Sequence, residues 1–451
     1  MNKLQPLSKK LFDIYALFTR EPFVRFFAKE LEFYSNGNDE LISFISIDLT
    51  DKDFYACILS RDKSMQFRAE KITGNIKTIE EAREWLAKSF NEDSITSHDN
   101  NYDYFDVFQK LDNSNKVHPH FELLRDADYM LSAKEVIKEV SYHYKDIDGN
   151  FIDQLQSLNG FDSRIFELYL FCFFREQFFS FNRDHEAPDF IIEKFNESIA
   201  VEAVTISRKP ENIDNIKNYK PKSKKEIDVK LDNEVPLMFS SALFDKVRKR
   251  YWNKPHIIGK PFIIAIADFH DTMSMTWSYG ALLQYLYGYN YKHHFSESGD
   301  LIVEPIKIES FEKTNGTQIP AGFFDNPDNN YISGILFSSI ATLSKFNRLG
   351  KQAGLGSNSN FLIRTVILHN HDKNADKPIL KSYIVDENSD ETWSEGMTLY
   401  HNPNAIHPIN PELFEETIAQ SFFDADKKNI VTIMPEVFPY SNLTKNTVLK
   451  K

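Results

Sequence analysis

Two short apolar segments joined by a polar turn constrain the fold of this chain more than any other stretch. The segments "PDFIIEKF" and "SIAVEAVTISR" flank the turn "NES", and both are rich in the β-branched and aromatic residues of strands. Strand alternation places Glu202 on the same face as Ala200 and Val204. A carboxylate buried in a strand that is apolar on both faces costs several kcal/mol unless a partner compensates it. A divalent metal ion near Glu202 is one way to compensate this cost.

The elements around this hairpin follow a regular order. A helix is predicted before it, in "DSRIFELYLFCFFREQFFSF", and is apolar on most sides. A lysine-rich loop follows the hairpin, then a helix in "SSALFDKVRKRYW" and an apolar strand in "KPFIIAIADF". The order helix, strand, strand, helix, strand is typical of an α/β fold.

The length of 451 residues predicts two to three domains. We expect an N-terminal mixed α/β region at 1–145, a core at 146–275 and a C-terminal α/β region at 276–451, which would serve recognition or oligomerisation. The composition, with 41% hydrophobic and 26% charged residues, is ordinary for a globular protein.

Two carboxylates are predicted to meet across the hairpin. Asp189 follows Pro188 at the start of the first strand, so strand pairing brings it toward Glu202. Two close carboxylates repel each other unless a cation lies between them, and Mg²⁺ binds one or two carboxylates together with water and phosphate oxygens. Glu167, on the preceding helix, is a third candidate ligand because it is the only charged residue within 165–174, with Glu176 as a weaker substitute.

This order of motifs resembles the PD-(D/E)XK nuclease superfamily. The matching residues stand as "IFELYLF", "APDF" and "AVEAVTI", and they span about 110 residues from Asp162 to His270. The resemblance implies a restriction-endonuclease-like core, a central mixed β-sheet flanked by helices. It also implies hydrolysis of phosphodiester bonds dependent on Mg²⁺ or Mn²⁺, with Glu167, Asp189 and Glu202 as catalytic and metal-binding residues. By analogy of fold, it suggests a role in bacterial restriction or phage defence.

The chain departs from the family signature at one position. The signature lysine, which orients or activates the attacking water, is replaced by Val204. This lysine moves to neighbouring elements in some members of the superfamily. Lys246 on the following helix is the first candidate for such a relocation, Lys249 the second and Lys209 the third.

The charge distribution favours a nucleic-acid partner; we expect DNA, although charge alone does not separate DNA from RNA. The chain has a net charge of −13, yet residues 206–260 contain 14 Lys/Arg and seven Asp/Glu, a local net charge of +7. A phosphate backbone is attracted by such a local excess. The predicted nucleic-acid-binding residues are Lys209, Lys224, Lys225, Arg248, Lys249 and Arg250.

Alternative interpretations use the same residues. Glu202 would be neutralised by Arg164 or Arg175, and Glu167 by Arg164 one helical turn away. The chain would then be a module that binds nucleic acid or protein without cutting it, or a structural subunit that assembles as a homodimer or with a partner.

Other features add less. The two cysteines, Cys57 and Cys172, fit a reducing cytoplasm, and the absence of a long apolar stretch predicts no membrane segment. "RLGKQAGLGSNS" (348–359) is predicted to be a mobile basic loop. The pairs His118–His120 and His369–His371 are interpreted as core or surface histidines. Asp268 and His270 end the third strand, where they could support the site.

Overall fold

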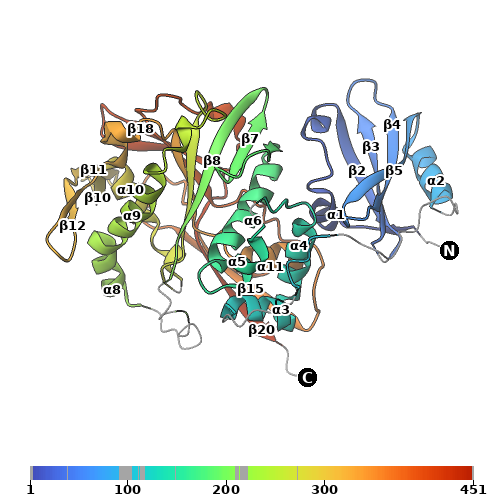
Figure 1. The fold of residues 1–451 in the computed structure, drawn as a ribbon, viewed down its shortest axis with the longest axis horizontal. Coiled ribbons are helices and arrows are strands. Elements are labelled where there is room, and N and C mark those ends of the chain that lie inside the picture. The colour runs from blue at the N-terminus through green and yellow to red at the C-terminus, as the bar shows by residue number, and fades with distance from the viewer. Residues whose placement is uncertain are drawn as a thin grey trace.

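The computed structural model describes residues 4–37, 39–90, 104–109, 111, 117–147, 149–208, 213, 222–271 and 273–448. Within them the chain is a mixed α/β protein with several sheets, the largest of eight strands (Figure 1). The α/β class predicted from the sequence is therefore confirmed.

The eight-stranded sheet contains the predicted hairpin, whose strands β8 and β7 are separated from one edge of the sheet by β6 alone. The strand order is β19-β18-β17-β14-β9-β8-β7-β6. The bounds are β6 Ser180–Asn182, β7 Phe190–Lys194, β8 Glu197–Ile206, β9 Phe262–Asp268, β14 Gly334–Ser338, β17 Met397–His401, β18 Ala419–Asp424 and β19 Asn429–Ile433. β6, β7 and β8 pair antiparallel, whereas β8, β9 and β14 run parallel. Both faces of a parallel segment must be covered, which explains why β9 is an unbroken apolar run.

Helices cover both faces of this sheet beside β8 (Figure 1). On one face, α6 (Phe161–Glu176) packs on Val201 and Ala203 of β8. On the other face, α9 (Val235–Val247) and α10 (Tyr279–Tyr287) pack on Ala200 and Ile206. The alternation of β8 thus sends its side chains into two separate hydrophobic cores.

The turn between β7 and β8 lies one residue earlier than predicted. It consists of Phe195 and Asn196, and Glu197 already belongs to β8. Both turn residues have positive φ, 52° and 64°, which is the geometry of a type I′ turn. Asparagine tolerates a positive φ, whereas phenylalanine does not favour it. The preferences of turn residues therefore predict the turn at "NES" and not at Phe195.

The N-terminal part forms a five-stranded sheet in the order β1-β2-β3-β4-β5. Its strands are β1 Gln5–Pro6, β2 Ala28–Ser35, β3 Leu41–Asp48, β4 Phe54–Arg61 and β5 Phe67–Ile76. α1 (Lys9–Ala16) and α2 (Ile79–Ser89) pack on this sheet, and Thr78 caps α2 as its sequence predicts. α3 (Pro119–Asp126), α4 (Leu131–Ser141) and α5 (Phe151–Gln156) connect it to α6.

The remaining helices, sheets and hairpins lie in the C-terminal half, apart from α8, whereas short helical turns occur along the whole chain. The helices are α8 (Lys224–Val229) and α11 (Leu343–Gln352), and β15 (Asn360–Leu368), β16 (Ile379–Ile384) and β20 (Pro439–Val448) form a three-stranded sheet. Two small hairpins pair β10 (Tyr289–Phe295) with β11 (Leu301–Lys307) and β12 (Ser310–Glu312) with β13 (Gln318–Pro320). Short helical turns are η1 Pro22–Phe26, η2 Asp128–Met130, η4 Lys230–Glu234, η5 Tyr251–Asn253, η6 Ser274–Thr276, η7 Phe323–Asp325, η8 Pro327–Asn329 and η9 Pro411–Leu413.

Strands from both sides of position 275 share the eight-stranded sheet, since β14 and β17–β19 extend the sheet begun by β6–β9. The three regions 1–145, 146–275 and 276–451 stay predictions as domains. Across the described residues, no helix combines the length and the apolar character needed to cross a membrane.

The prediction of a basic loop at 348–359 is wrong in its first half. Residues 348–352 form the last turn and a half of α11. Arg348 is 1% exposed and donates to both carboxylate oxygens of Glu391, each at 2.7 Å. Its charge serves a buried ion pair rather than a substrate-facing loop.

Candidate active site

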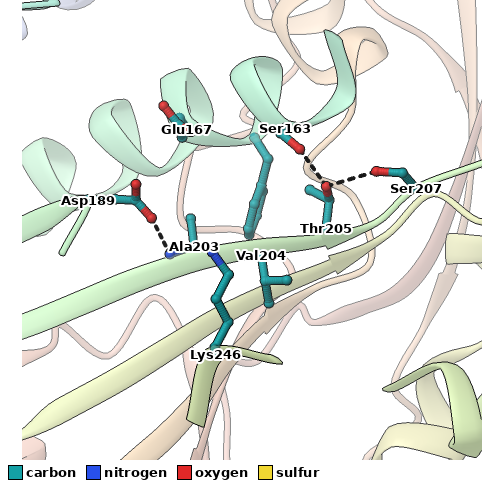
Figure 2. Close-up of a pocket in the computed structure, with 9 residues that line it drawn as sticks. Ser163, Glu167, Asp189, Ala203, Val204, Thr205, Ser207 and Lys246 are labelled. Atoms are coloured by element: carbon teal, nitrogen blue, oxygen red, sulfur yellow. Dashed lines mark hydrogen bonds between the residues drawn. The ribbon is translucent and has the colours of Figure 1, made fainter. Parts of the chain in front are cut away.

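A pocket of about 210 Å³ lies where α6, the start of β7, the end of β8 and α9 meet (Figure 2). Its lining residues are Ser163, Phe166, Glu167, Asp189, Ala203, Val204, Thr205, Ser207 and Lys246. The volume is far above the ~15 Å³ that one water needs, so the pocket has room for a hydrated ion or a phosphate group. Three of the four residues predicted to be catalytic, Glu167, Asp189 and Lys246, line it together.

Asp189 directly precedes β7, at the open end of the β7–β8 hairpin. Its Oδ2 accepts a hydrogen bond of 2.7 Å from the backbone N–H of Ala203 (Figure 2). The side chain of Arg183 donates to the backbone carbonyl of Asp189 at 3.2 Å, which fixes the main chain. Burial raises the pKa of Asp189 well above its usual range, and the negative charges of Glu202 and Glu167 raise this pKa further. The neighbourhood of Asp189 is therefore one in which a cation would be stabilised.

Glu202 is buried and has two lysine partners. Its residue is 3% exposed, and its Oε1 accepts from Nζ of Lys246 at 2.7 Å and from Nζ of Lys249 at 3.4 Å. The carboxylate near Lys249 raises the pKa of that lysine despite the opposing effect of burial. The buried acid is thus neutralised from the helix α9 side.

The sequence of α9 explains why Lys246 reaches this position. Phe239 and Leu243 are fully buried against the sheet, and Lys246 follows Leu243 by three residues on the same side of the helix. Because Glu202 points to the α9 face of β8, the lysine amine meets it there. Figure 2 shows Lys246 extending from α9 toward the strand at Ala203 and Val204.

The other two candidate lysines differ in position. Lys249 lies just beyond the end of α9 and makes the longer contact with Glu202. Lys209 falls outside the described residues. Of the two candidate lysines that the structure describes, Lys246 is the one that both lines the pocket and contacts a predicted metal ligand.

Glu167 lines the pocket but is already engaged. Its Oε2 accepts from Nη1 of Arg164 at 2.7 Å, the contact across one helical turn that the sequence indicates, and from the hydroxyl of Tyr144 at 3.1 Å. Burial raises the pKa of Glu167, and the Arg164 charge opposes this rise. Glu176, the proposed substitute, instead accepts from the backbone N–H groups of Trp393 and Ser394 at 3.0 and 2.7 Å.

The arginines proposed as partners of Glu202 have other roles. Arg164 donates to Glu167 and Asn150. Arg175 donates to backbone carbonyls, among them that of Leu17 at 3.1 Å. The cations beside Glu202 are lysines.

A row of hydroxyl groups on the pocket wall was not anticipated from the sequence. The hydroxyl of Ser163 lies 2.6 Å from that of Thr205, which lies 3.3 Å from that of Ser207 (Figure 2). Thr205 shares a face of β8 with Ala203, Ser207 directly follows the end of β8, and Ser163 precedes Glu167 by one helical turn. Once Glu167 and Ala203 are expected to face each other, the spacing of Ser163 from Glu167 and of Thr205 from Ala203 predicts that these hydroxyls also lie close together.

The predicted nucleic-acid-binding residues that are described are exposed. Lys224 and Lys225 begin α8, whereas Arg248, Lys249 and Arg250 follow the end of α9. Of these, Lys249 is next to the pocket through Glu202. The aromatic ring of Tyr251 lies 5.3 Å from Nζ of Lys249, and the exposed ring of Phe244 lies 5.8 Å from the guanidinium of Arg248.

Asp268 and His270 contact each other at the carboxyl end of β9. Oδ1 of Asp268 lies 2.7 Å from Nδ1 of His270, and both residues are buried. By strand alternation Asp268 lies on the α9 face, opposite Ile206 in register. Their role as supports of the site stays a prediction.

The two H-x-H pairs prove different from one another. His118 and His120 gather with Asp162, their ligand atoms all lying within 4.8 Å of one another. Among the described residues this is the group of three such side chains that meets this distance, so Glu167, Asp189 and Glu202 do not meet it together. His118 is buried and His120 is half-buried, which agrees with their interpretation as core or surface histidines, and the nearby Asp162 is 42 residues further along the chain than His120. His369 and His371 contact Tyr440 and the carbonyl of Glu436.

Comparisons of the chain with protein-family models, with curated proteins and with solved structures found no match.

Proposed function

We propose that this protein is a metal-dependent nuclease of the PD-(D/E)XK kind, with a restriction-endonuclease-like core, in which Lys246 replaces the lysine of the signature. The observation that carries the proposal is the contact of 2.7 Å between Lys246 and Glu202 at a pocket that also contains Asp189. A lysine from the following helix thereby occupies the neighbourhood where a side chain at position 204 would project, since Val204 lines the same pocket. Along the chain the helices and strands follow the order α6, β6, β7, β8, α8, α9, β9, and this order supports the proposed core.

Asp189 and Glu202 fit a divalent cation. Burial, followed by the negative charges of Glu202 and Glu167, raises the pKa of Asp189, and a cation between two acids relieves their repulsion. Mg²⁺ or Mn²⁺ held by these carboxylates would supply Lewis-acid stabilisation of the charge that develops on a phosphate. Glu167 contributes further negative charge from α6.

The remaining pocket groups suit a phosphodiester. The Lys246 ammonium would orient an attacking water and stabilise negative charge in this proposal, which its contact with Glu202 supports. The hydroxyls of Ser163, Thr205 and Ser207 are donors for phosphate oxygens on the opposite wall. The exposed basic residues after α9 would hold the backbone of DNA beyond the scissile bond.

A second candidate function is binding without cleavage. The observation that favours it is the pairing of each acid with a protein group: Glu202 with two lysines, Glu167 with Arg164 and Asp189 with a backbone N–H. In this case the acids would stabilise the fold, and the basic surface alone would bind nucleic acid or a partner protein.

Cleavage assays separate the two candidates. Supercoiled plasmid, single-stranded DNA and RNA would be incubated with Mg²⁺ or Mn²⁺ and with wild type, Asp189→Asn or Glu202→Gln. The matched control is Glu193→Gln, which removes an acid from the same hairpin but outside the pocket. The proposal predicts cleavage by wild type and Glu193→Gln, and loss of about 10²-fold or more in the other two. Binding of DNA by all four proteins with no cleavage by any of them would instead support the second candidate. Equal cleavage by all four proteins would refute the assignment of Asp189 and Glu202.

A further inference from the structure

The pair His118–His120 and the carboxylate of Asp162 lie together where two helices begin. His118 caps the N-terminus of α3, and His120 lies in the first turn of that helix. Asp162 lies in the first turn of α6. One ligand atom from each of the three residues falls within 4.8 Å of the other two. Two imidazoles and one carboxylate can therefore coordinate a single ion.

The rings are held in place by a shared neighbour. The imidazole of His118 stacks on Phe161, with ring centroids 4.6 Å apart and planes at 11°. The ring of His120 lies 6.1 Å from Phe161 and 5.2 Å from His118. Phe161 directly precedes Asp162, so the ring that both histidines contact and the carboxylate come from the same turn of α6. Such preorganisation by a neighbouring side chain is a property of metal sites.

The surroundings select among ions. A cation held by charge alone is disfavoured at this site. Two helix N-termini lie there, and the positive charge of the Arg208 guanidinium acts on His118, His120 and Asp162. Nitrogen ligands bind Zn²⁺ and neighbouring transition ions far better than Mg²⁺ or Ca²⁺, which prefer oxygen. His118 is 1% exposed, whereas His120 and Asp162 are half-buried, so an ion can enter from the side of His120 and Asp162.

Binding would change one hydrogen bond. Nδ1 of His118 accepts from the backbone N–H of His120 at 3.1 Å. Coordination through Nε2 moves the ring proton to Nδ1 and breaks this bond, whereas coordination through Nδ1 replaces it directly. The loss of one capping hydrogen bond is small beside the free energy with which structural zinc sites bind their ion.

We propose that His118, His120 and Asp162 form a binding site for Zn²⁺ or a similar transition-metal ion, separate from the carboxylate pocket. The ion would join α3 to α6 with three protein ligands and leave a fourth position for water or an anionic group. This inference is independent of the nuclease proposal, because it concerns other ligands and another class of metal.

Metal binding by the full-length protein tests the inference. After treatment with a chelator and removal of the chelator, wild type would be titrated with Zn²⁺ by calorimetry and with Co²⁺ by visible absorption. We expect about one equivalent of tight binding and d–d bands typical of low coordination number. His120→Ala and Asp162→Asn should each weaken binding by about 10²-fold or more.

The matched control is His371→Ala, from the other H-x-H pair, which is exposed and has no partner set of this kind among the described residues. It should bind as wild type does. Unfolding temperatures with and without Zn²⁺ provide a second measurement, with a rise expected for wild type and His371→Ala and none for Asp162→Asn. Failure of wild type to bind, or equal binding by all four proteins, would overturn the proposal.

Discussion

Nζ of Lys246 and Oε1 of Glu202 lie 2.7 Å apart, although the two residues are separated by 44 positions in the chain. The side chain of Glu202 is 4% exposed and that of Lys246 is 18% exposed, so the pair is largely removed from water. The contact joins α9 to β8 beside Val204, at the position where the nuclease signature would place its own lysine. Stability and proposed activity therefore depend on the same pair.

The first prediction concerns the free energy of unfolding. Lys246→Met should destabilise the protein by about 1–3 kcal/mol, because Glu202 keeps its charge and retains only the longer contact to Lys249. Combining it with Glu202→Gln should cost less than the sum of the two single changes. A double-mutant cycle by urea unfolding measures the coupling, and strict additivity would show that the contact contributes nothing.

Asp189 should make the stability fall as the pH rises. Burial and the charges of Glu202 and Glu167 raise the pKa of its folded state, so the folded protein binds this proton more tightly than the unfolded chain. Stability is then lost from the unfolded pKa near 3.9 upward to the folded pKa. Asp189→Asn, which can still accept from Ala203, should be more stable than wild type at pH 7 without divalent metal. Addition of Mg²⁺ should narrow this difference, and a less stable Asp189→Asn protein would contradict the assignment.

His143 should make the folded protein less stable as the pH falls into the acidic range. Its ring stacks on Phe18 at 5.1 Å, and burial, followed by the charge of Arg68, lowers its pKa to about 3. The unfolded histidine binds a proton near pH 6.5, so this contribution to stability is present above that value and is lost as the pH falls below it. His143→Phe should reduce the drop in unfolding temperature between pH 7 and pH 5. Because burial also lowers the pKa of His118 and His120, part of the drop should persist.

Affinity for DNA should depend on the basic residues beyond α9. Arg248→Ala combined with Arg250→Ala removes two exposed charges and spares Lys249, which contacts Glu202. We expect weaker binding and a slope of log affinity against log salt that is smaller by about 2. Lys373→Ala combined with Lys377→Ala, two exposed lysines outside this region, is the control. Equal slopes for both double variants would place the DNA elsewhere.

Local patterns were sufficient to predict much of the fold. The apolar run of β9, the alternation of β8 and the Thr78 cap of α2 each follow from rules that act within a few residues. The proximity of Asp189 to β8 also followed, since a short hairpin fixes its own register.

Features that depend on distant residues could not be read in the same way. Arg348 looked like part of a mobile loop because its partner Glu391 lies 43 positions away. Likewise, Asp162 joins His118 and His120 only through the packing of α3 against the start of α6. The sequence predicts three candidates for the relocated lysine. Lys246 is distinguished because it lies on the same side of α9 as the buried residues Phe239 and Leu243, and it contacts Glu202.

The most direct test of the account moves the lysine back to the signature position. Initial rates of Mg²⁺-dependent DNA cleavage would be compared for wild type, Lys246→Ala, and Lys246→Ala combined with Val204→Lys, each checked for folding by circular dichroism. The account predicts a loss of about 10²-fold or more for Lys246→Ala and recovery by about tenfold or more in the double variant, because position 204 opens on the same pocket. Wild-type rates for Lys246→Ala, or a folded double variant no faster than Lys246→Ala, would contradict it.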